Sequence, residues 1–275
     1  MQQIVQARKQ LAAHLGFDDF ASYNLETKMG KAFLKERVVM RGEDLHHDLA
    51  DMDWFATHLF GITGRRFSEK QLELLNYIWS STGYPDASIW PNNTAALAGS
   101  VRSTASLAMA AGLINSEATL FGGRPLKRTQ DFFLRAKKLR KHGLSIKEIV
   151  EGEIDGRGVI FGYGRPLASV DERVPHTLKK VRELGFGEGE FVLMCLEINN
   201  YLIETRKIAM NIVALDGAIG ADFGFTPEEF HLYMNLCFYS GQPPCYLDAV
   251  EKPEGSFFPI RCESIVYSGK EKRAW

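Results

Sequence analysis

Apolar residues recur with helical spacing along most of the chain, and two of the helices that they predict begin with a capping box. In this motif the first and fourth residues each bond the other's backbone N–H. Ser68 and Gln71 have this spacing, and the sequence LELLNYIWSS follows with apolar residues every three or four positions. Ser145 and Glu148 repeat the motif after a glycine. Helices are therefore predicted from both points.

The strongest helix start is Thr226, which is followed by a proline at the first helical position and by Glu229 three residues after the cap. The helix is expected to run through HLYMNLCFYS and to end near Gly241. Residues 191–207, FVLMCLEINNYLIETRK, are hydrophobic around most of the helical circumference, which predicts a buried helix. Residues 101–113 are rich in Ala, Ser and Gly, which suits close helix packing.

Strand patterns are few. The best candidates are residues 38–42, VVMRG, and residues 264–269, SIVYSG. The sequence therefore predicts a mainly α fold.

A glycine-rich segment over residues 151–166 interrupts this helical pattern, with five glycines in sixteen residues. It is predicted to be a loop that bends sharply or lets a ligand approach the backbone. No Gly-Lys-Ser/Thr follows, which excludes a P-loop, and no G-x-G-x-x-G opens a helix after a strand. Taken alone, the segment is best interpreted as an ordinary turn.

Composition narrows the functional classes. The chain has 275 residues, 45% of them hydrophobic, and a net charge of −1, so no strong positive field favours nucleic acid as a partner. The four cysteines form no C-x-x-C pair and no histidines have metal-ligand spacing, so no metal is expected and the thiols fit a reducing compartment. No apolar run reaches about 18 residues and none near the start resembles a signal peptide. We therefore expect a cytoplasmic protein without a membrane partner.

Five segments, in order, resemble motifs of the citrate synthase and citryl-CoA lyase family. LFGITGRRFSEKQLELL near residue 59 is similar to a family helix entry, and residues 120–123 (LFGG) are similar to its His-Gly-Gly turn. Residues 159–165 (VIFGYGR) with 171–173 (DER) resemble a Gly-x-Gly-His-Arg loop that ends in Asp-Pro-Arg. Residues 214–220 (ALDGAIG) resemble the segment that carries the family's catalytic aspartate, and 260–269 resemble its C-terminal arginine and Tyr-x-Gly ending. The chain looks closer to citryl-CoA lyase modules than to full-length synthases.

The resemblance implies a fold, an assembly and a ligand. The fold would be a citrate synthase-like multi-helical one, with a large helical domain and a smaller helical lobe. An N-terminal helical extension would cover residues 1–37 and the family domain residues 38–275, with the small lobe at roughly residues 125–215. The family builds each active site from two subunits, so a homodimer is expected. Coenzyme A would be present as thioester substrate or product.

Four positions depart from the family's site residues. Arg165 replaces a histidine that bonds the substrate carbonyl; it can stabilise an oxyanion or a carboxylate, but it cannot act as a general acid. Phe121 replaces the histidine of the His-Gly-Gly turn. Asn92 falls on a substrate-binding histidine, where it can orient a substrate but not titrate. Gln242 falls on an arginine, and the loss of that charge makes a tricarboxylate a poor match.

Other positions retain the family's residue types. Asp216 matches the carboxylate that takes a proton from the carbon next to the thioester; taken alone, its position beside a glycine favours a helix-capping role. Arg173 matches the arginine that holds a substrate carboxylate, and Arg261 matches one that reaches the partner subunit's site. Either could also be an ordinary surface arginine. Gly162, Tyr163 and Gly164 form the part of the loop expected to contact the cofactor.

The favoured hypothesis is an enzyme that makes or cleaves a C–C bond next to a CoA thioester. The second substrate would be a small oxo- or hydroxy-acid other than citrate. Asp216 would move the proton, Arg165 would hold an oxyanion or carboxylate, and the two would face one cleft. The alternative is a CoA-binding or regulatory homologue without activity; a purely structural module fits the retained glycine loop less well.

Overall fold

The computed structural model describes residues 2–14, 26–120, 122–165, 170–257 and 260–270. The chain divides into two compact units, Met1–Thr57 and His58–Trp275. The first unit contains helix α1 (Gln2–His14) and a three-stranded antiparallel sheet in the order β1-β2-β3. Its strands are β1 (Gly30–Phe33), β2 (Arg37–Met40) and β3 (Glu43–Asp44).

Strand β2 confirms the strand expected at residues 38–42, although it begins one residue earlier. It pairs with β1 in a register that joins Gly30 to Met40. The β1–β2 ladder therefore connects residues on both sides of the boundary predicted between residues 37 and 38. The domain limits implied by the resemblance, including the lobe over residues 125–215, stay predictions.

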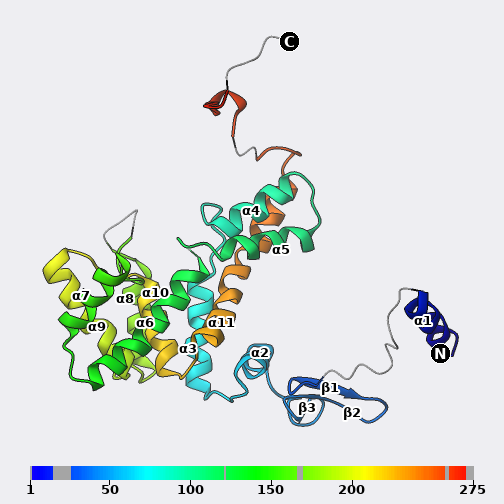
Figure 1. The fold of residues 1–275 in the computed structure, drawn as a ribbon, viewed down its shortest axis with the longest axis horizontal. Coiled ribbons are helices and arrows are strands. Elements are labelled where there is room, and N and C mark those ends of the chain that lie inside the picture. Colours follow the sequence, from blue (N-terminus) through cyan, green and yellow to red (C-terminus); the bar gives the residue numbers. More distant parts are fainter. Residues whose placement is uncertain (1, 15–25, 121, 166–169, 258–259, 271–275) are drawn as a thin grey trace. The chain divides into compact units, whose positions relative to one another are not determined.

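The rest of the chain is mainly helical, which confirms the predicted fold class (Figure 1). Helix α2 (Trp54–Thr63) leads out of the first unit. The second unit then contains the following elements: α3 (Glu69–Thr82), α4 (Trp90–Ser100), α5 (Ala105–Ser116), α6 (Gly123–Lys141), α7 (Ile146–Arg157), α8 (Arg173–Glu183), α9 (Glu190–Arg206), α10 (Ile212–Asp222), α11 (Pro227–Ser240), α12 (Gln242–Glu251) and a 3-10 turn (Cys262–Ser264).

The predicted caps are confirmed. Both capping boxes form, at Ser68 ahead of α3 and at Ser145 ahead of α7. Thr226 caps α11 in the same way, and that helix ends at Gly241 as expected. These three motifs depend only on neighbouring residues, which is why the sequence alone locates them.

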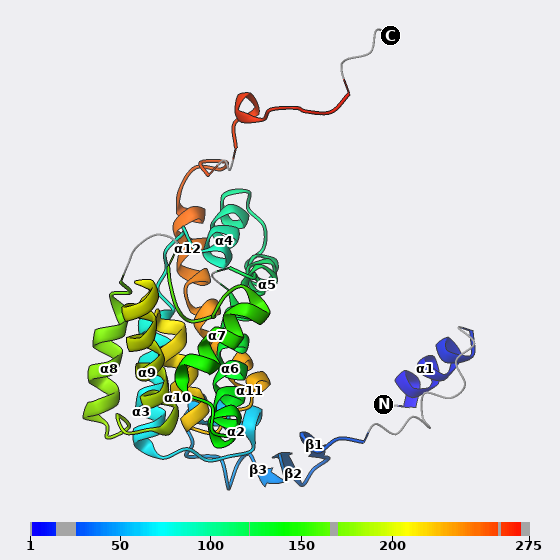
Figure 2. The same cartoon turned by 60° about the vertical axis from the view of Figure 1, so that its left-hand side comes forward.

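Helix α10 lies at the centre of the second unit. It packs against α6 and α9, and α11 packs against α6 (Figure 2). Nine of its eleven residues are buried. A Cβ atom at Gly217 would lie 3.1 Å from Thr129 of α6, and one at Gly220 only 2.6 Å from the ring of Phe230 of α11. The small residues of this helix therefore allow its neighbours to approach closely.

Helices α4, α5 and α12 form a second group, and α11 connects it to the group around α10. The helix expected over residues 101–113 is displaced: α5 begins after Thr104 and continues past Gly112 to Ser116. Helix α9 is buried along one face, but Leu193 and Ile203 remain 40% and 42% exposed, so its burial is less complete than predicted.

Two local predictions are wrong. Residues 264–269 form no strand: within 260–270 the chain makes one 3-10 turn, and the exposed residues after it pair with no described strand. The first half of the glycine-rich segment is helical, because α7 includes Gly152 and Gly156 and ends at Arg157. The capping box at its start offsets a cost of about 1 kcal/mol for each internal glycine. The loop proper begins at Gly158, which has a positive φ of 72°.

Candidate active site

The glycine loop after α7 is fastened to the chain just ahead of α10. Gly162 and Gly164 have φ values of 87° and 85°, which other residues rarely adopt. A Cβ atom at Gly162 would lie 2.9 Å from Ala214. The N–H of Gly164 donates to the Ala209 carbonyl at 2.8 Å, and the N–H of Asn211 donates to the Gly162 carbonyl at 2.9 Å. The loop thus follows the surface of α10 at close range.

Tyr163 lies between these glycines and points into the core. It is 7% exposed, forms an isolated β-bridge with Met210, and donates from its hydroxyl to the Cys195 carbonyl at 3.1 Å. Burial raises the pKa of Tyr163 well above its ordinary value. The structure gives Gly162, Tyr163 and Gly164 a part in fixing the loop, and their expected contact with a cofactor stays a prediction.

Asp171 connects the end of the loop region to the start of α10. Its Oδ2 accepts from the N–H of Ile212 at 2.9 Å and from Arg173 Nη2 at 2.8 Å. Its Oδ1 accepts from Arg173 Nε at 2.9 Å. Burial alone would raise the pKa of Asp171, but the hydrogen bonds from Arg173 and Ile212 lower it to about 2. A buried carboxylate therefore both caps α10 and positions the Arg173 guanidinium.

Replacing Asp171 with Ala should lower the free energy of unfolding by about 3–5 kcal/mol, because it leaves the Arg173 charge and the Ile212 N–H without their partner. Urea denaturation measures this effect. Asp131→Ala is the matched control, since Asp131 pairs with Arg135 at 2.9 Å but is 45% exposed. That variant should lose about 1 kcal/mol or less. Equal losses in the two variants would contradict the assigned role of Asp171.

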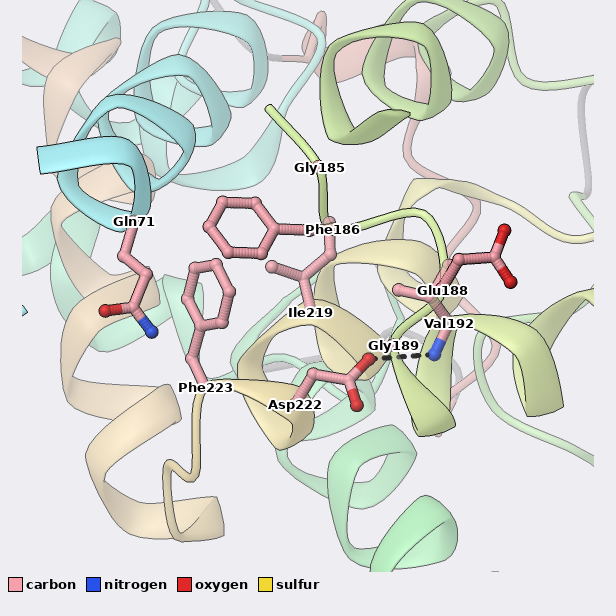
Figure 3. A pocket seen from close by; sticks show the side chains of 9 residues that line it. All are labelled: Gln71, Gly185, Phe186, Glu188, Gly189, Val192, Ile219, Asp222 and Phe223. Carbon is pink, nitrogen blue, oxygen red and sulfur yellow. Dashed lines mark hydrogen bonds between the residues drawn. The ribbon is translucent and has the colours of Figure 1, made fainter. Parts of the chain in front are cut away.

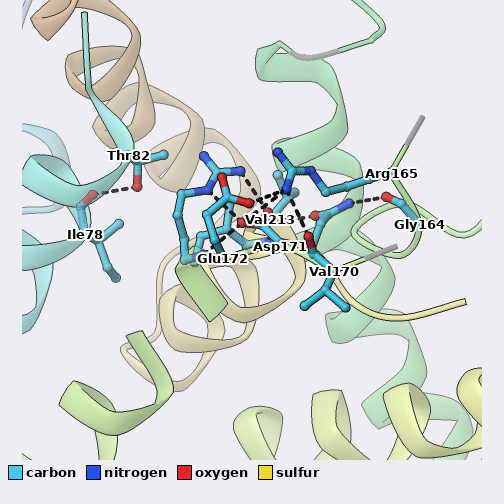
Figure 4. A network of polar contacts seen from close by, with 11 residues as sticks. Ile78, Thr82, Gly164, Arg165, Val170, Asp171, Glu172 and Val213 are labelled. Carbon is cyan, nitrogen blue, oxygen red and sulfur yellow. Dashed lines mark hydrogen bonds and ion pairs between the residues drawn. The ribbon is translucent and has the colours of Figure 1, made fainter. Parts of the chain in front are cut away.

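Arg165 lies beside the carboxylates of Asp171 and Glu172 (Figure 4). Its Nη1 donates to Glu172 Oε2 at 2.6 Å and to the Val170 carbonyl at 3.2 Å, and it lies 3.9 Å from Asp171 Oδ1. Arg165, Asp171, Glu172 and Arg173 thus form a group of alternating charge, which we call the arginine cluster.

Asp216 occupies the second turn of α10 and is 1% exposed. Neither of its carboxylate oxygens has a hydrogen-bond partner among the residues that the structure describes. Burial raises the pKa of Asp216 to about 8; the charge of Arg173 opposes this rise, and that of Asp171 adds to it. At neutral pH this carboxyl is therefore mostly protonated, in contrast to Asp171.

The electrostatic neighbours of Asp216 come from three helices. Its charge adds to the rise in pKa that burial causes at Cys195 of α9 and Cys237 of α11. Burial lowers the pKa of Arg173 of α8, but the hydrogen bond and charge of Asp171 outweigh this effect and raise it. Tyr84 and Asp216 make smaller contributions in the same direction. Arg173 is thus the guanidinium whose charge acts on Asp216. That Arg165 and Asp216 face one cleft stays a prediction.

Asn92 and Gln242 lie together at the junction of α4 and α12. Asn92 is 2% exposed and donates to the carbonyls of Tyr84 at 3.1 Å and Asp86 at 3.0 Å. A Cβ atom at Gly241 would lie 2.6 Å from Asn92 Nδ2. Gln242 is fully buried and donates to the Phe238 carbonyl at 3.0 Å. Asn92 therefore fixes the segment that contains Tyr84 and Asp86, and both predicted substrate contacts stay predictions.

Two predicted site residues remain, Arg261 and Phe121. Arg261 is exposed and directly precedes the 3-10 turn. Phe121 lies outside the described residues. From the sequence, Asp171 was named only as part of the DER motif, although the Asp-x-Arg spacing of residues 171–173 could have indicated that it pairs with Arg173. Tyr84 was not named, and the sequence offers no comparable pattern for it.

A cavity of about 320 Å³ lies at the other end of α10, between the start of α3 and the loop ahead of α9 (Figure 3). Asp222 lines it and accepts hydrogen bonds from the N–H groups of Phe191 and Val192, each at 3.0 Å. Phe186 and Phe223 meet edge to face within it. Since the Asp222 carboxylate caps α9, its evident role is structural.

Two features are absent from the part of the chain that the structure describes. Within the described ranges, no group of three or more His, Cys, Asp or Glu side chains could hold a metal ion. None of the described helices combines the length and apolar character needed to cross a bilayer.

Comparison with known proteins identifies the fold. No protein-family model and no curated protein matches the sequence. Among solved structures, citryl-CoA lyase from Hydrogenobacter thermophilus has a TM-score of 0.81 at 16% identity, with 92% of this chain and 98% of that chain covered. ATP citrate lyase from Methanothrix soehngenii, in complex with citrate and coenzyme A, has a TM-score of 0.76 at 17% identity, with 95% and 44% covered. Citrate synthase from Thermotoga maritima has a TM-score of 0.62 at 16% identity, with 80% and 59% covered. The chain therefore has the fold of these proteins, and it spans nearly the whole length of the citryl-CoA lyase.

Proposed function

We propose that this protein is an enzyme that makes or cleaves a C–C bond next to a CoA thioester, with a small oxo- or hydroxy-acid other than citrate as the second substrate. The observation that carries the proposal is Asp216: a buried carboxyl that bonds none of the residues the structure describes, close enough to Arg173 for its charge to act. Burying such a group costs stability, so its retention is easier to understand if it serves chemistry. The shared fold with CoA-dependent lyases and synthases supports the thioester assignment.

In the proposed reaction, the fraction of Asp216 that is ionised at neutral pH acts as the base; its raised pKa makes that fraction small but makes the carboxylate a stronger base. It removes a proton from the α-carbon of the thioester, and the resulting enolate attacks the carbonyl of the oxo-acid. The fixed charge of Arg165 holds the carboxylate of the oxo-acid and stabilises the adjacent new alkoxide, whose proton comes from water, because arginine cannot supply one. Cleavage reverses these steps: the C–C bond breaks, and neutral Asp216 returns the proton to the enolate carbon.

The acid is proposed to differ from citrate for two reasons. Gln242 supplies no charge where a third carboxylate would need one, and it is buried within its own packing. Arg165 carries a positive charge and donates to Glu172, whereas the histidine of the resembled motif would be a neutral hydrogen-bond donor, so the charge presented to the substrate is different.

The function is tested by α-carbon exchange. The protein is incubated with acetyl-CoA and longer acyl-CoA thioesters in deuterated water, with and without an oxo-acid, and deuterium uptake is followed by mass spectrometry. Exchange above the protein-free rate is expected with at least one thioester. Its absence with every thioester would remove the proposal.

The alternative is a homologue that binds CoA without turnover. It is favoured by the burial of Asp216, because at 1% exposure this carboxyl meets no solvent in the present conformation. Calorimetric CoA binding without any exchange is the result that would establish it.

We also propose a homodimer, on the basis of the surface of α5. That helix, ASLAMAAGLINS, has no charged residue, and Leu107 and Ile114 on it are 66% and 74% exposed. Since they are seven positions apart, they lie on one helical face. An exposed apolar face without charge is typical of a protein interface.

Replacing Ile114 with Glu should therefore convert a dimer to a monomer, as measured by light scattering after size-exclusion chromatography. Ile203→Glu is the matched control, since Ile203 is also an exposed isoleucine, but on α9. A monomeric wild type, or dissociation by both variants alike, would exclude this interface.

A further inference from the structure

The two arginines of the arginine cluster are held in different ways. Arg173 is bonded to both oxygens of Asp171, whose side chain is 0% exposed and also accepts from the N–H of Ile212. Asp171 cannot move away without leaving the Ile212 N–H, the first of α10, without its acceptor. The Arg173–Asp171 pair is therefore a fixed part of the fold.

Arg165 is held by a carboxylate that can leave. Its shortest contact, 2.6 Å, is to Glu172, and the Glu172 side chain is 69% exposed. The backbone N–H of Glu172 and the Arg165 guanidinium lower the pKa of this carboxyl, so it is ionised at neutral pH. Because an exposed ion pair contributes little net stability, water can replace Arg165 as the partner of Glu172 at small cost.

The charges in the cluster then favour one kind of ligand. Asp171 and Arg173 neutralise each other, and Glu172 neutralises Arg165. When Glu172 swings into solvent, the cluster has one uncompensated positive charge on a guanidinium that can bond a carboxylate through two N–H groups. One carboxylate balances that charge, whereas each additional one would have to approach Asp171, which is 3.9 Å from Arg165.

The sequence supports the same view. Arg165 and Glu172 are two positions at which the chain departs from the motifs that it resembles, where histidine and proline stand. These two departures contact each other directly.

Building on the proposed function, we propose that Glu172 determines specificity by occupying Arg165 until a single carboxylate of the substrate acid takes its place. The second substrate is thus an acid with one carboxylate available to the site, such as a 2-oxo monocarboxylic acid.

The inference is tested by calorimetric binding of pyruvate, oxaloacetate and citrate to the full chain, without any need for turnover. Wild type should bind pyruvate more tightly than citrate. Glu172→Gln removes the internal competitor and should tighten pyruvate binding about two- to fivefold, as expected for an exposed ion pair. Arg165→Gln should abolish binding, and the double variant should resemble Arg165→Gln.

Glu254→Gln is the matched control, because Glu254 also forms an exposed ion pair, with Arg102 at 3.7 Å and 78% exposure. It should leave pyruvate binding unchanged. Circular dichroism confirms that each variant is folded.

Three results would overturn the inference: no binding of any acid to wild type, tighter binding of citrate than of pyruvate, or unchanged or weaker pyruvate binding in Glu172→Gln. The exchange assay separates this outcome from the proposed function. Exchange with an unaltered Glu172→Gln affinity rejects only the role of Glu172, whereas the expected affinities without exchange reject only the chemistry.

Discussion

Asp216→Asn should lower the rate of deuterium exchange at the thioester α-carbon by about 10²–10⁴-fold, the usual contribution of a positioned acid or base. The substitution keeps the size of the side chain but removes its ability to accept and return a proton. Thioester binding should change little, because neither Asp216 oxygen bonds any described residue and the assigned role is proton transfer only. The rate is measured by mass spectrometry and the affinity by calorimetry, under the same conditions.

Asp222→Asn is the matched control for this prediction. Asp222 lies on the same helix, and burial likewise raises its pKa, but its oxygens accept from the backbone of α9. Its substitution should leave the exchange rate within about twofold of wild type in the folded protein. Similar losses in the two variants would show that the effect reflects the packing of α10 and not proton transfer.

The stability of the protein should fall as the pH rises from 5 to 7, by up to about 1.4 kcal/mol per pH unit from Asp216 alone. In the unfolded chain this carboxyl has its ordinary pKa of 3.8, whereas burial raises the pKa to about 8 in the folded protein. Between these values the folded state keeps a proton that the unfolded state has released. The folded state is therefore penalised progressively as the pH rises, and the penalty is complete above pH 8.

Urea denaturation of wild type and Asp216→Asn at pH 5, 6 and 7 isolates this contribution, because other titrating groups are common to both. Their difference in unfolding free energy should grow in favour of the variant as the pH rises. Asp171 does not interfere, since its pKa of about 2 places its own titration far below this range. Parallel pH profiles for the two proteins would mean that Asp216 is ionised in the folded state throughout.

The sequence predicted the features that depend on near neighbours. The capping boxes at Ser68, Ser145 and Thr226 are complete within four residues, and each begins a helix where expected. The strand predicted from the apolar pattern of residues 264–269 was wrong, because a strand needs a partner strand and the pattern itself does not specify one. The loop predicted around Gly152 was wrong for the opposite reason: the capping box at Ser145 stabilises the helix by more than the two weak helix formers, Gly152 and Gly156, destabilise it.

The site was predictable only where a motif carried it. Asp216 was singled out from its resemblance to a known segment, but its burial without a hydrogen-bond partner could not be read from the sequence. Asp171 bonds Ile212 across 41 positions, and no local pattern predicts such a contact. Similarly, Asn92 donates to the carbonyl of Tyr84, which a side chain eight positions away reaches only in the folded chain, and its assignment to a substrate stays a prediction.

The account depends on the raised pKa of Asp216, which sets the strength of the base, and infrared difference spectroscopy observes the protonation state of this carboxyl directly. The spectrum of Asp216→Asn is subtracted from that of wild type between pH 4 and 10, and the C=O band of a protonated carboxyl is followed. The band should persist through pH 7 and disappear with a midpoint near pH 8, as the raised pKa requires. A midpoint near the ordinary value of 3.8 would show that the carboxyl is solvated or paired, and would contradict the raised pKa from which the strength of the base is argued.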